Sequence, residues 1–216
     1  FEYNPAVEYL KEYVASGELG QVYYINATRV NLGIFQKDIN VIWDLAPHDI
    51  SILLYVLNAL PSQVSARGAA YVQPGIEDVA YVTVYFPDGV MADVRVSWLD
   101  PCKIRRITVV GSKKMIVYDD VEPTEKIKIY DKGVDKPPYS DTMEEFRLSY
   151  RYGDITTPAI SLAEPLELEC RHFLDAIRYG RRPRSDGHVG WKVVRILEGA
   201  QESLKKGGTA VDLVWT

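Results

Sequence analysis

Two alternating segments around one turn constrain the fold of this chain more than any other feature. Residues 77–86 and 90–99 flank Pro87-Asp88-Gly89, a turn sequence whose glycine tolerates the positive φ that tight turns need. Apolar and polar side chains alternate along both segments, and a period of two is typical of a strand with one buried face. We therefore expect a β-hairpin that places one face in the core.

The remaining pattern predicts a mixture of helices and strands. The expected strands are 21–30, 63–72, 104–110, 114–118, 127–130 and 210–214. The expected helices run from Asn4-Pro5 to Gly17 and from Asp44 to Asn58, with two more marked by Leu166 to Gly180 and Val189 to Leu204, and residues 131–163 form a long aperiodic excursion. This order indicates an α+β fold, a largely antiparallel (mixed) open β-sheet with helices packed on one face. No G-x-G-x-x-G follows a strand, so we expect no Rossmann domain in this chain.

Composition restricts the partners of the chain. A net charge of -5 and the lack of a basic arm argue against nucleic acid, and no apolar run approaches a membrane span. The two cysteines, Cys102 and Cys170, are too few for a disulfide scaffold, so we expect free thiols in a reducing compartment. The chain opens on Phe1 without a targeting segment, and we expect a cytoplasmic protein.

The segment Trp43-Asp44-Leu45-Ala46-Pro47-His48-Asp49 is the main candidate for chemistry. Asp44 and His48 are four residues apart and share one helix face. A histidine titrates near neutral pH and suits a general base for a substrate hydroxyl, while a carboxylate nearby can orient it. In the alternative interpretation, Asp44 is the N-cap, Pro47 lies in the first turn, and His48 satisfies the helix N-terminus. Asp49 points elsewhere, and we interpret it as a favourable charge in the first turn.

Other polar residues could contact a polyhydroxylated ligand. The candidates are Tyr3, Asn4, Arg29, Asn31 and Asn40, although each could equally serve as a cap, a surface group or a sheet hydrogen bond. Lys103, Arg105 and Arg106 could meet a diphosphate, but a solvated strand face is the favoured interpretation. No third ligand accompanies Asp44 and His48, so we expect no metal site.

One strand face has the composition of a subunit interface. Tyr81, Thr83 and Tyr85 face Asp93 and Arg95 across the expected hairpin, a surface too apolar for free solvent and too polar for a core. We therefore expect a homo-oligomer that forms through the face of the β-sheet.

Several segments together resemble a known family. N-P-A-V at 4–7, S-G-E-L-G at 16–20, W-D-L-A-P-H-D at 43–49 and F-L-D-A-I-R-Y-G-R-R-P at 173–183 are similar to the C-terminal domain of the glucose-fructose oxidoreductase, inositol dehydrogenase and MocA family. The stretches at 75–80, 97–101 and 109–115 look most like members that act on nucleotide sugars, the UDP-N-acetylglucosamine or UDP-N-acetylglucosaminuronate 3-dehydrogenases.

The resemblance implies a function for the whole chain. Residues 1–216 would form the substrate-binding and oligomerisation domain of a two-domain oxidoreductase, and a missing N-terminal domain would bind NAD or NADP. The enzyme would oxidise a secondary sugar hydroxyl, C3 of a UDP-sugar being the expected position, with His48 as base and Asp44 aligning it. The family's E-K-P lysine is not in this chain, so these residues alone should be inactive. The alternative is a non-catalytic binding or assembly domain that uses the sheet as its interface.

Overall fold

A nine-stranded sheet organises the protein. The computed structural model describes residues 1–135, 149–161 and 163–215. Its strands are β1 (Val22–Val30), β2 (Gln63–Ala69), β3 (Val79–Tyr85), β4 (Met91–Ser97), β5 (Ile104–Gly111), β6 (Met115–Asp119), β7 (Ile127–Asp135), β8 (Ser149–Thr156) and β9 (Val211–Asp212). Their order in the sheet is β8-β7-β6-β5-β1-β4-β3-β2-β9. Only β1 and β4 pair in parallel among the described strands, so the sheet is mixed and largely antiparallel, as predicted.

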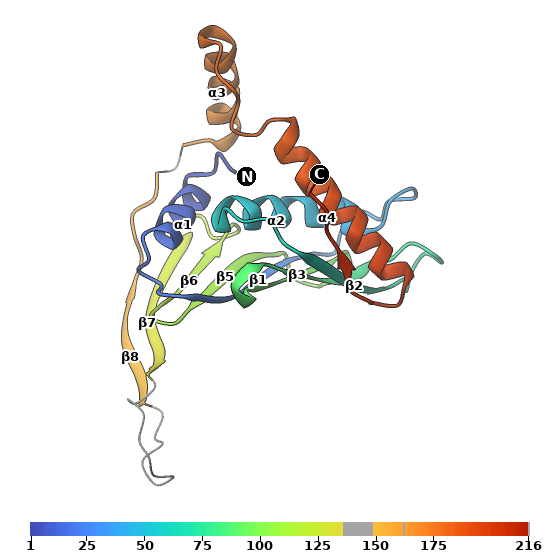
Figure 1. Cartoon of the computed structure of the whole chain (residues 1–216), viewed down its shortest axis with the longest axis horizontal. Helices are drawn as coiled ribbons and strands as arrows, with labels where there is room; N and C mark the ends of the chain where they lie inside the picture. The colour runs from blue at the N-terminus through green and yellow to red at the C-terminus, as the bar shows by residue number, and fades with distance from the viewer. Residues whose placement is uncertain (136–148, 162, 216) are drawn as a thin grey trace.

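Helices cover one face of this sheet. They are α1 (Pro5–Ala15), α2 (Val41–Leu57), α3 (Pro165–Tyr179) and α4 (Gly187–Lys205). Figure 1 shows α1, α2 and α4 lying along the upper face of the sheet, which confirms the predicted α+β arrangement. The core lies between these three helices and the apolar side of the strands.

The predicted hairpin forms between β3 and β4. Val82 is paired with Val94, and both are fully buried. The connection is the short helix η1 (Pro87–Gly89), in which Asp88 and Gly89 have φ angles of 61° and 78°. Positive φ at two successive positions explains why an aspartate and a glycine stand there.

Helix α2 begins earlier than the sequence indicated. Asn40, not Asp44, is the N-cap, and its Oδ1 accepts a hydrogen bond from the backbone N–H of Trp43 at 3.3 Å. An asparagine is as good an N-cap as an aspartate. Val41 and Ile42 are buried, so the first turn of α2 lies in the core. Pro47 consequently lies in the second turn, inside the helix rather than at its start. The prediction of Asp44 as N-cap is therefore wrong.

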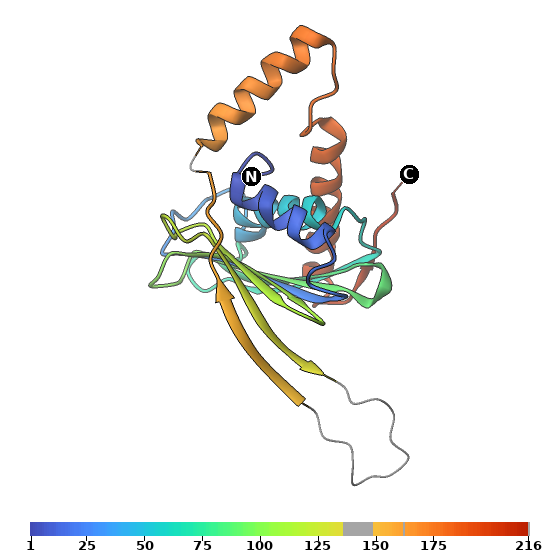
Figure 2. The ribbon, with the colours of Figure 1, turned by 90° about the vertical axis from the view of Figure 1, so that its left-hand side faces the viewer.

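Part of the expected excursion over 131–163 is a β-ribbon. Strand β7 continues to Asp135 and pairs antiparallel with β8, and Figures 1 and 2 show both strands curving away from the helix-covered part. Residues 136–148 and 162 of that prediction lie outside the described residues. The side chains of β8 are mostly exposed. Its short polar and aromatic sequence accordingly lacks the apolar alternation that a buried strand would show.

Helix α3 differs from the other three. It stands away from the sheet in Figures 1 and 2, and only Ala176 is buried among its residues. Its apolar side chains Leu166, Phe173, Leu174, Ile177 and Tyr179 are exposed.

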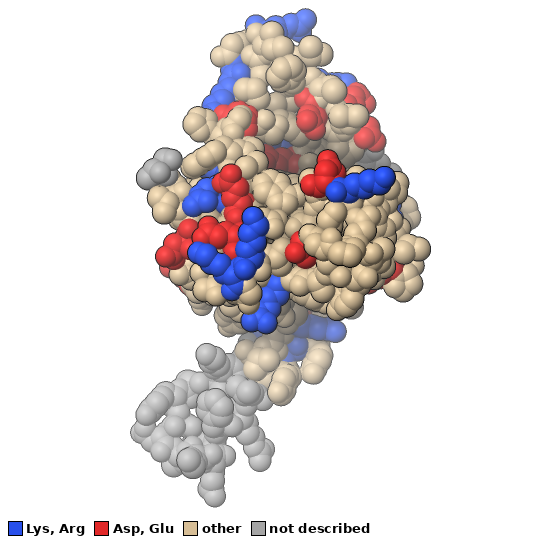
Figure 3. All heavy atoms as spheres, turned by 90° about the vertical axis from the view of Figure 1, so that its right-hand side faces the viewer, with Lys and Arg blue, Asp and Glu red and all other residues tan. Residues whose placement is uncertain are grey.

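The surface charges are mixed. On the face shown in Figure 3, acidic and basic side chains lie beside one another instead of gathering by sign. Separately, none of the described helices combines the length and apolar character that a membrane span requires.

Candidate active site

The structure places His48 at the edge of a cavity. The side chain projects from the second turn of α2 and is partly exposed, and the ring of Phe1 packs against it with centroids 5.2 Å apart. The cavity has a volume of about 490 Å³ and lies between the first residues of the chain, α2 and α4. Its lining also includes Tyr3, Trp43, Ser51 and Asp186. This volume is in the range of small-molecule sites.

The surroundings keep the imidazole of His48 neutral. Loss of solvent on the packed side of the ring lowers the pKa of His48 to about 4, helped by the positive charges of Arg29 and Arg105. The negative charge of Asp44 opposes this shift in pKa. Neither ring nitrogen has a hydrogen-bond partner among the described residues. At neutral pH the ring can therefore accept a proton from a ligand in the cavity.

Asp44 is fixed by an indole. Its Oδ2 accepts a hydrogen bond from Nε1 of the buried Trp98 at 2.8 Å. Phe35 packs edge-on against the same indole, with ring centroids 5.5 Å apart. Within the described part of the chain no group donates to Oδ1 of Asp44, and Asp44 and His48 share no hydrogen bond. The carboxylate therefore has one held oxygen and one available oxygen on the helix face of His48.

Arg29 and Asp49 form a buried ion pair. Arg29 donates from Nε to Oδ2 at 2.7 Å and from Nη2 to Oδ1 at 3.1 Å, and the two side chains are 3% and 1% exposed. Burial raises the pKa of Asp49, and the two bonds from Arg29 oppose that shift. The prediction that Asp49 is a favourable charge in the first helical turn is wrong. Helix α2 starts at Val41, so Asp49 lies about two turns further on and is buried against Arg29 of β1. The ring of Phe1 lies 4.7 Å from the Arg29 guanidinium, which completes its enclosure.

The other predicted ligand contacts hold the fold together. The Tyr3 hydroxyl lies 3.1 Å from Oγ of Ser185, and Asn4 caps α1 through a 2.9 Å bond from the N–H of Ala6. The side-chain amide of Asn40 donates to Glu77 and Gln201 at 2.8 and 2.9 Å.

Tyr3 lines the same cavity as His48, but Asn40 does not. Asn40 lines a separate cavity of about 450 Å³. Asn31 follows the end of β1 and has no side-chain hydrogen bond among the described residues. Whether any of the five contacts a ligand stays a prediction.

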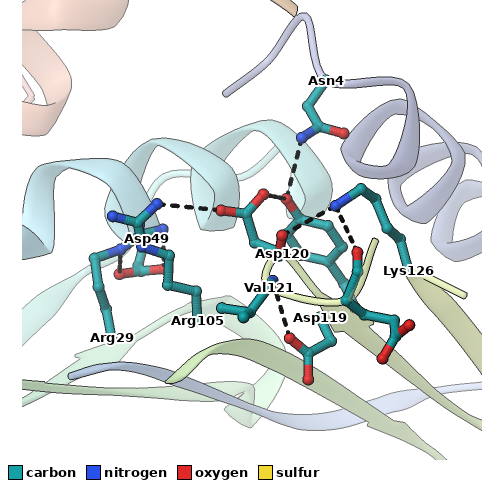
Figure 4. Close-up of polar contacts among 10 residues, drawn as sticks. Asn4, Arg29, Asp49, Arg105, Asp119, Asp120, Val121 and Lys126 are labelled. Atoms are coloured by element: carbon teal, nitrogen blue, oxygen red, sulfur yellow. Dashed lines mark hydrogen bonds and ion pairs between the residues drawn. The ribbon is translucent and has the colours of Figure 1, made fainter. Parts of the chain in front are cut away.

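A polar cluster beneath α2 was not found from the sequence. Figure 4 shows Arg29 and Arg105 rising side by side from the sheet toward the helix layer. Tyr118 donates to Oδ1 of Asp120 at 2.8 Å and accepts from Nδ2 of Asn4 at 3.2 Å, and its burial raises the pKa of the phenol. Only the alternation of strand 104–110 hinted that Arg105 and Arg106 face opposite sides.

No three His, Cys, Asp or Glu side chains gather in the described ranges. Gly33 lies in the loop between β1 and α2, where a dinucleotide fold would place its phosphate-binding glycines. A Cβ there would lie 2.9 Å from the Trp98 ring, so this glycine makes room for the indole.

Comparison with known proteins gives the family. A model of the GFO/IDH/MocA C-terminal domain matches residues 7–117, and the chain belongs to this family. It is 25% identical over 221 residues to an uncharacterized oxidoreductase, YrbE, of Bacillus subtilis (strain 168), covering 95% of this chain and 59% of that protein.

Two solved structures have a similar fold. UDP-N-acetylglucosamine 3-dehydrogenase GnnA from Acidithiobacillus ferrooxidans has a TM-score of 0.70 and 24% identity, over 94% of this chain and 60% of that one. Levoglucosan dehydrogenase in complex with NADH and L-sorbose has a TM-score of 0.75 and 17% identity, over 100% and 65%. The chain thus spans about three-fifths of the length of these relatives.

Proposed function

We propose that residues 1–216 form the substrate-binding and subunit-contact domain of a two-domain, NAD(P)-dependent oxidoreductase that oxidises a secondary hydroxyl of a sugar. The observation that carries the proposal is the neutral, accessible imidazole of His48, which lines a cavity one helical turn from the anchored carboxylate of Asp44. The fold shared with UDP-N-acetylglucosamine 3-dehydrogenase favours C3 of a UDP-sugar as the position oxidised.

The side chains of this chain supply the proton chemistry. Oxidation of an alcohol removes the hydroxyl proton and a hydride from carbon. His48 accepts the proton, and the available Oδ1 of Asp44 accepts a hydrogen bond from a neighbouring hydroxyl of the sugar. A nicotinamide, when bound, would accept the hydride, and we assign its site to a separate domain.

Two features support a further domain. The relatives are longer than this chain by about two-fifths of their own length, and the apolar face of α3 has no cover among the described residues. A packed domain would remove that face from water.

Substitution at His48 in the two-domain protein tests the proposal. We expect His48→Asn to lower kcat with NAD and UDP-N-acetylglucosamine by about 10²- to 10⁴-fold, while the melting temperature and assembly stay unchanged. His188→Asn, the same substitution at an exposed histidine outside this cavity, is the matched control. Residues 1–216 alone should show no turnover, and clear turnover by them would overturn the domain assignment.

The alternative function is a non-catalytic assembly domain. The open face of the sheet favours it, because Tyr24, Tyr81 and Met91 from three adjacent strands are each nearly half exposed there. Homo-oligomerisation through this face belongs to both proposals, and Tyr81→Arg should dissociate the oligomer in sedimentation. If His48→Asn leaves the turnover rate intact, the assembly function stands and the catalytic one does not.

A further inference from the structure

Two arginines occupy directly opposed positions beneath α2. Arg29 on β1 and Arg105 on β5 are partners in the antiparallel register, and both side chains rise toward the helix layer (Figure 4). Like charges placed directly opposite each other on neighbouring strands destabilise a sheet. Such a pair is tolerated where carboxylates or another anion compensate both charges.

Only one of the two charges is fully compensated. Arg29 makes the bidentate pair with Asp49. Arg105 makes a single contact, from Nη1 to Oδ2 of Asp120, and at 3.5 Å this contact is at the limit of a hydrogen bond. The other oxygen of Asp120 already accepts from Tyr118. The remaining N–H donors of Arg105 have no partner among the described residues, and its side chain is 37% exposed.

The adjacent arginine shows what full pairing looks like on this strand. Arg106 donates from Nε and Nη2 to Oδ2 of Asp119, at 3.1 and 2.8 Å. Successive strand residues point to opposite faces, so Arg106 lies on the far side of the sheet from His48. Arg105 is therefore the arginine of this pair with donors to spare on the helix-covered side of the sheet (Figure 4). It is not among the residues that line the cavity of His48, but its charge reaches the imidazole.

We propose that Arg105 binds an oxyanion of the substrate, a carboxylate or a phosphoryl group, beside His48. The planar guanidinium matches either group with two parallel hydrogen bonds. The proposal rests on the function proposed above and adds to it a requirement that the sugar substrate be anionic. A uronate carboxylate and the diphosphate of a nucleotide sugar are the two sources of that chemistry.

An anion bound to Arg105 also changes the pKa of His48, the proposed general base. The side chains whose charges act on His48 are Arg29 from β1, Arg105 from β5 and Asp44 from α2. A bound oxyanion cancels the charge of Arg105 and removes one cause of the low pKa of His48. The pKa of the imidazole then rises toward the working pH, which improves it as a general base.

Binding to the 216-residue chain tests the proposal without any cofactor. We would titrate the wild-type chain by calorimetry with UDP, glucuronate, UDP-N-acetylglucosamine and UDP-N-acetylglucosaminuronate. Arg105→Met should weaken binding of the anion it contacts by about 10- to 150-fold, the loss of a charge-assisted hydrogen bond. Weaker UDP binding assigns the phosphate, and weaker binding of only the two uronates assigns the carboxylate.

Matched variants separate the possible outcomes. Arg106→Met should bind the ligands with the affinity of the wild type. Arg105→Lys should have an affinity between those of the wild type and Arg105→Met, and it takes the place of Arg105→Met in the test if that variant does not fold. His48→Asn should retain anion binding, so a failure of the catalytic proposal leaves this one measurable. Equal affinities for the wild type and Arg105→Met, or no binding of any of the four ligands by the wild type, would overturn the proposal.

Discussion

Helices α2 and α3 both carry apolar residues at helical spacing, but α2 is the more apolar of the two and their surroundings differ greatly. Helix α2 is buried against the sheet and the other helices, and its buried residues are Val41, Ile42, Ala46, Asp49, Ile50, Ile52, Leu53 and Val56. Helix α3 buries only Ala176 among the described residues. The pattern of apolar residues therefore predicts that a helix has a face to bury, but it does not say what covers that face.

The largest expected difference between the two helices concerns their ion pairs. Arg29→Met should destabilise the protein by about 3–5 kcal/mol, because it leaves the Asp49 carboxylate of α2 buried without a partner. In α3 the pair Arg171–Glu167 is exposed, and Arg171→Met should cost only about 0.3–0.5 kcal/mol. Urea unfolding of the two variants measures both values, and equal losses would contradict the distinction.

A matched pair of leucines tests the packing of the two helices. Leu53 of α2 is 1% exposed, and Leu53→Ala should cost about 2–5 kcal/mol through lost burial and a cavity. Leu174 of α3 is 65% exposed, so Leu174→Ala should change the stability of residues 1–216 by less than about 0.5 kcal/mol. Thermal unfolding of the two variants measures both changes in stability. A large loss at Leu174 in this chain would show that α3 is covered there.

The attachment of α2 to the sheet at Asp44 should be weaker than its core packing. Trp98→Phe removes the indole donor to the carboxylate, and we expect a loss of about 1.5–3 kcal/mol, typical of a hydrogen bond to a charged group. Asp44→Asn in the Trp98→Phe background should add little further loss. A double-mutant cycle with no coupling between the two positions would contradict the assigned hydrogen bond.

The smallest effect concerns the charge of His48. Its pKa is lowered to about 4, so the unfolded chain binds a proton that the folded chain does not between about pH 6.5 and 4. Stability should therefore fall as the pH drops through this window, and His48→Asn should reduce that fall. Arg105→Met removes one nearby positive charge and should raise the pKa of His48 in an NMR titration. An unchanged midpoint would contradict the electrostatic account.

The sequence predicted the local secondary structure better than it predicted the contacts between distant residues. The β3–β4 hairpin followed from strict alternation around residues 87–89, and α1 followed from the Asn4-Pro5 start. The start of α2 was missed by one turn because two residues four positions apart, Asn40 and Asp44, are both good caps.

In the candidate site, too, the sequence predicted the local geometry but not the contacts between distant residues. The spacing of Asp44 and His48 was enough to place them on one helix face, because helical geometry is local. Nothing in the spacing linked Asp44 to Trp98, which lies 54 residues further on, or set Arg105 beside Arg29.

The sequence by itself determined the period of each strand and helix, the turn at Asp88-Gly89, and the shared face of Asp44 and His48, because backbone sterics and side-chain periodicity act over a few residues. Only the tertiary structure decided that Asp49 is buried against Arg29. It also decided that, within the described part of the chain, Arg105 keeps unpaired donors and α2 is covered while α3 is not. Those outcomes depend on strand order and register, which bring distant residues together and set which charges lose water.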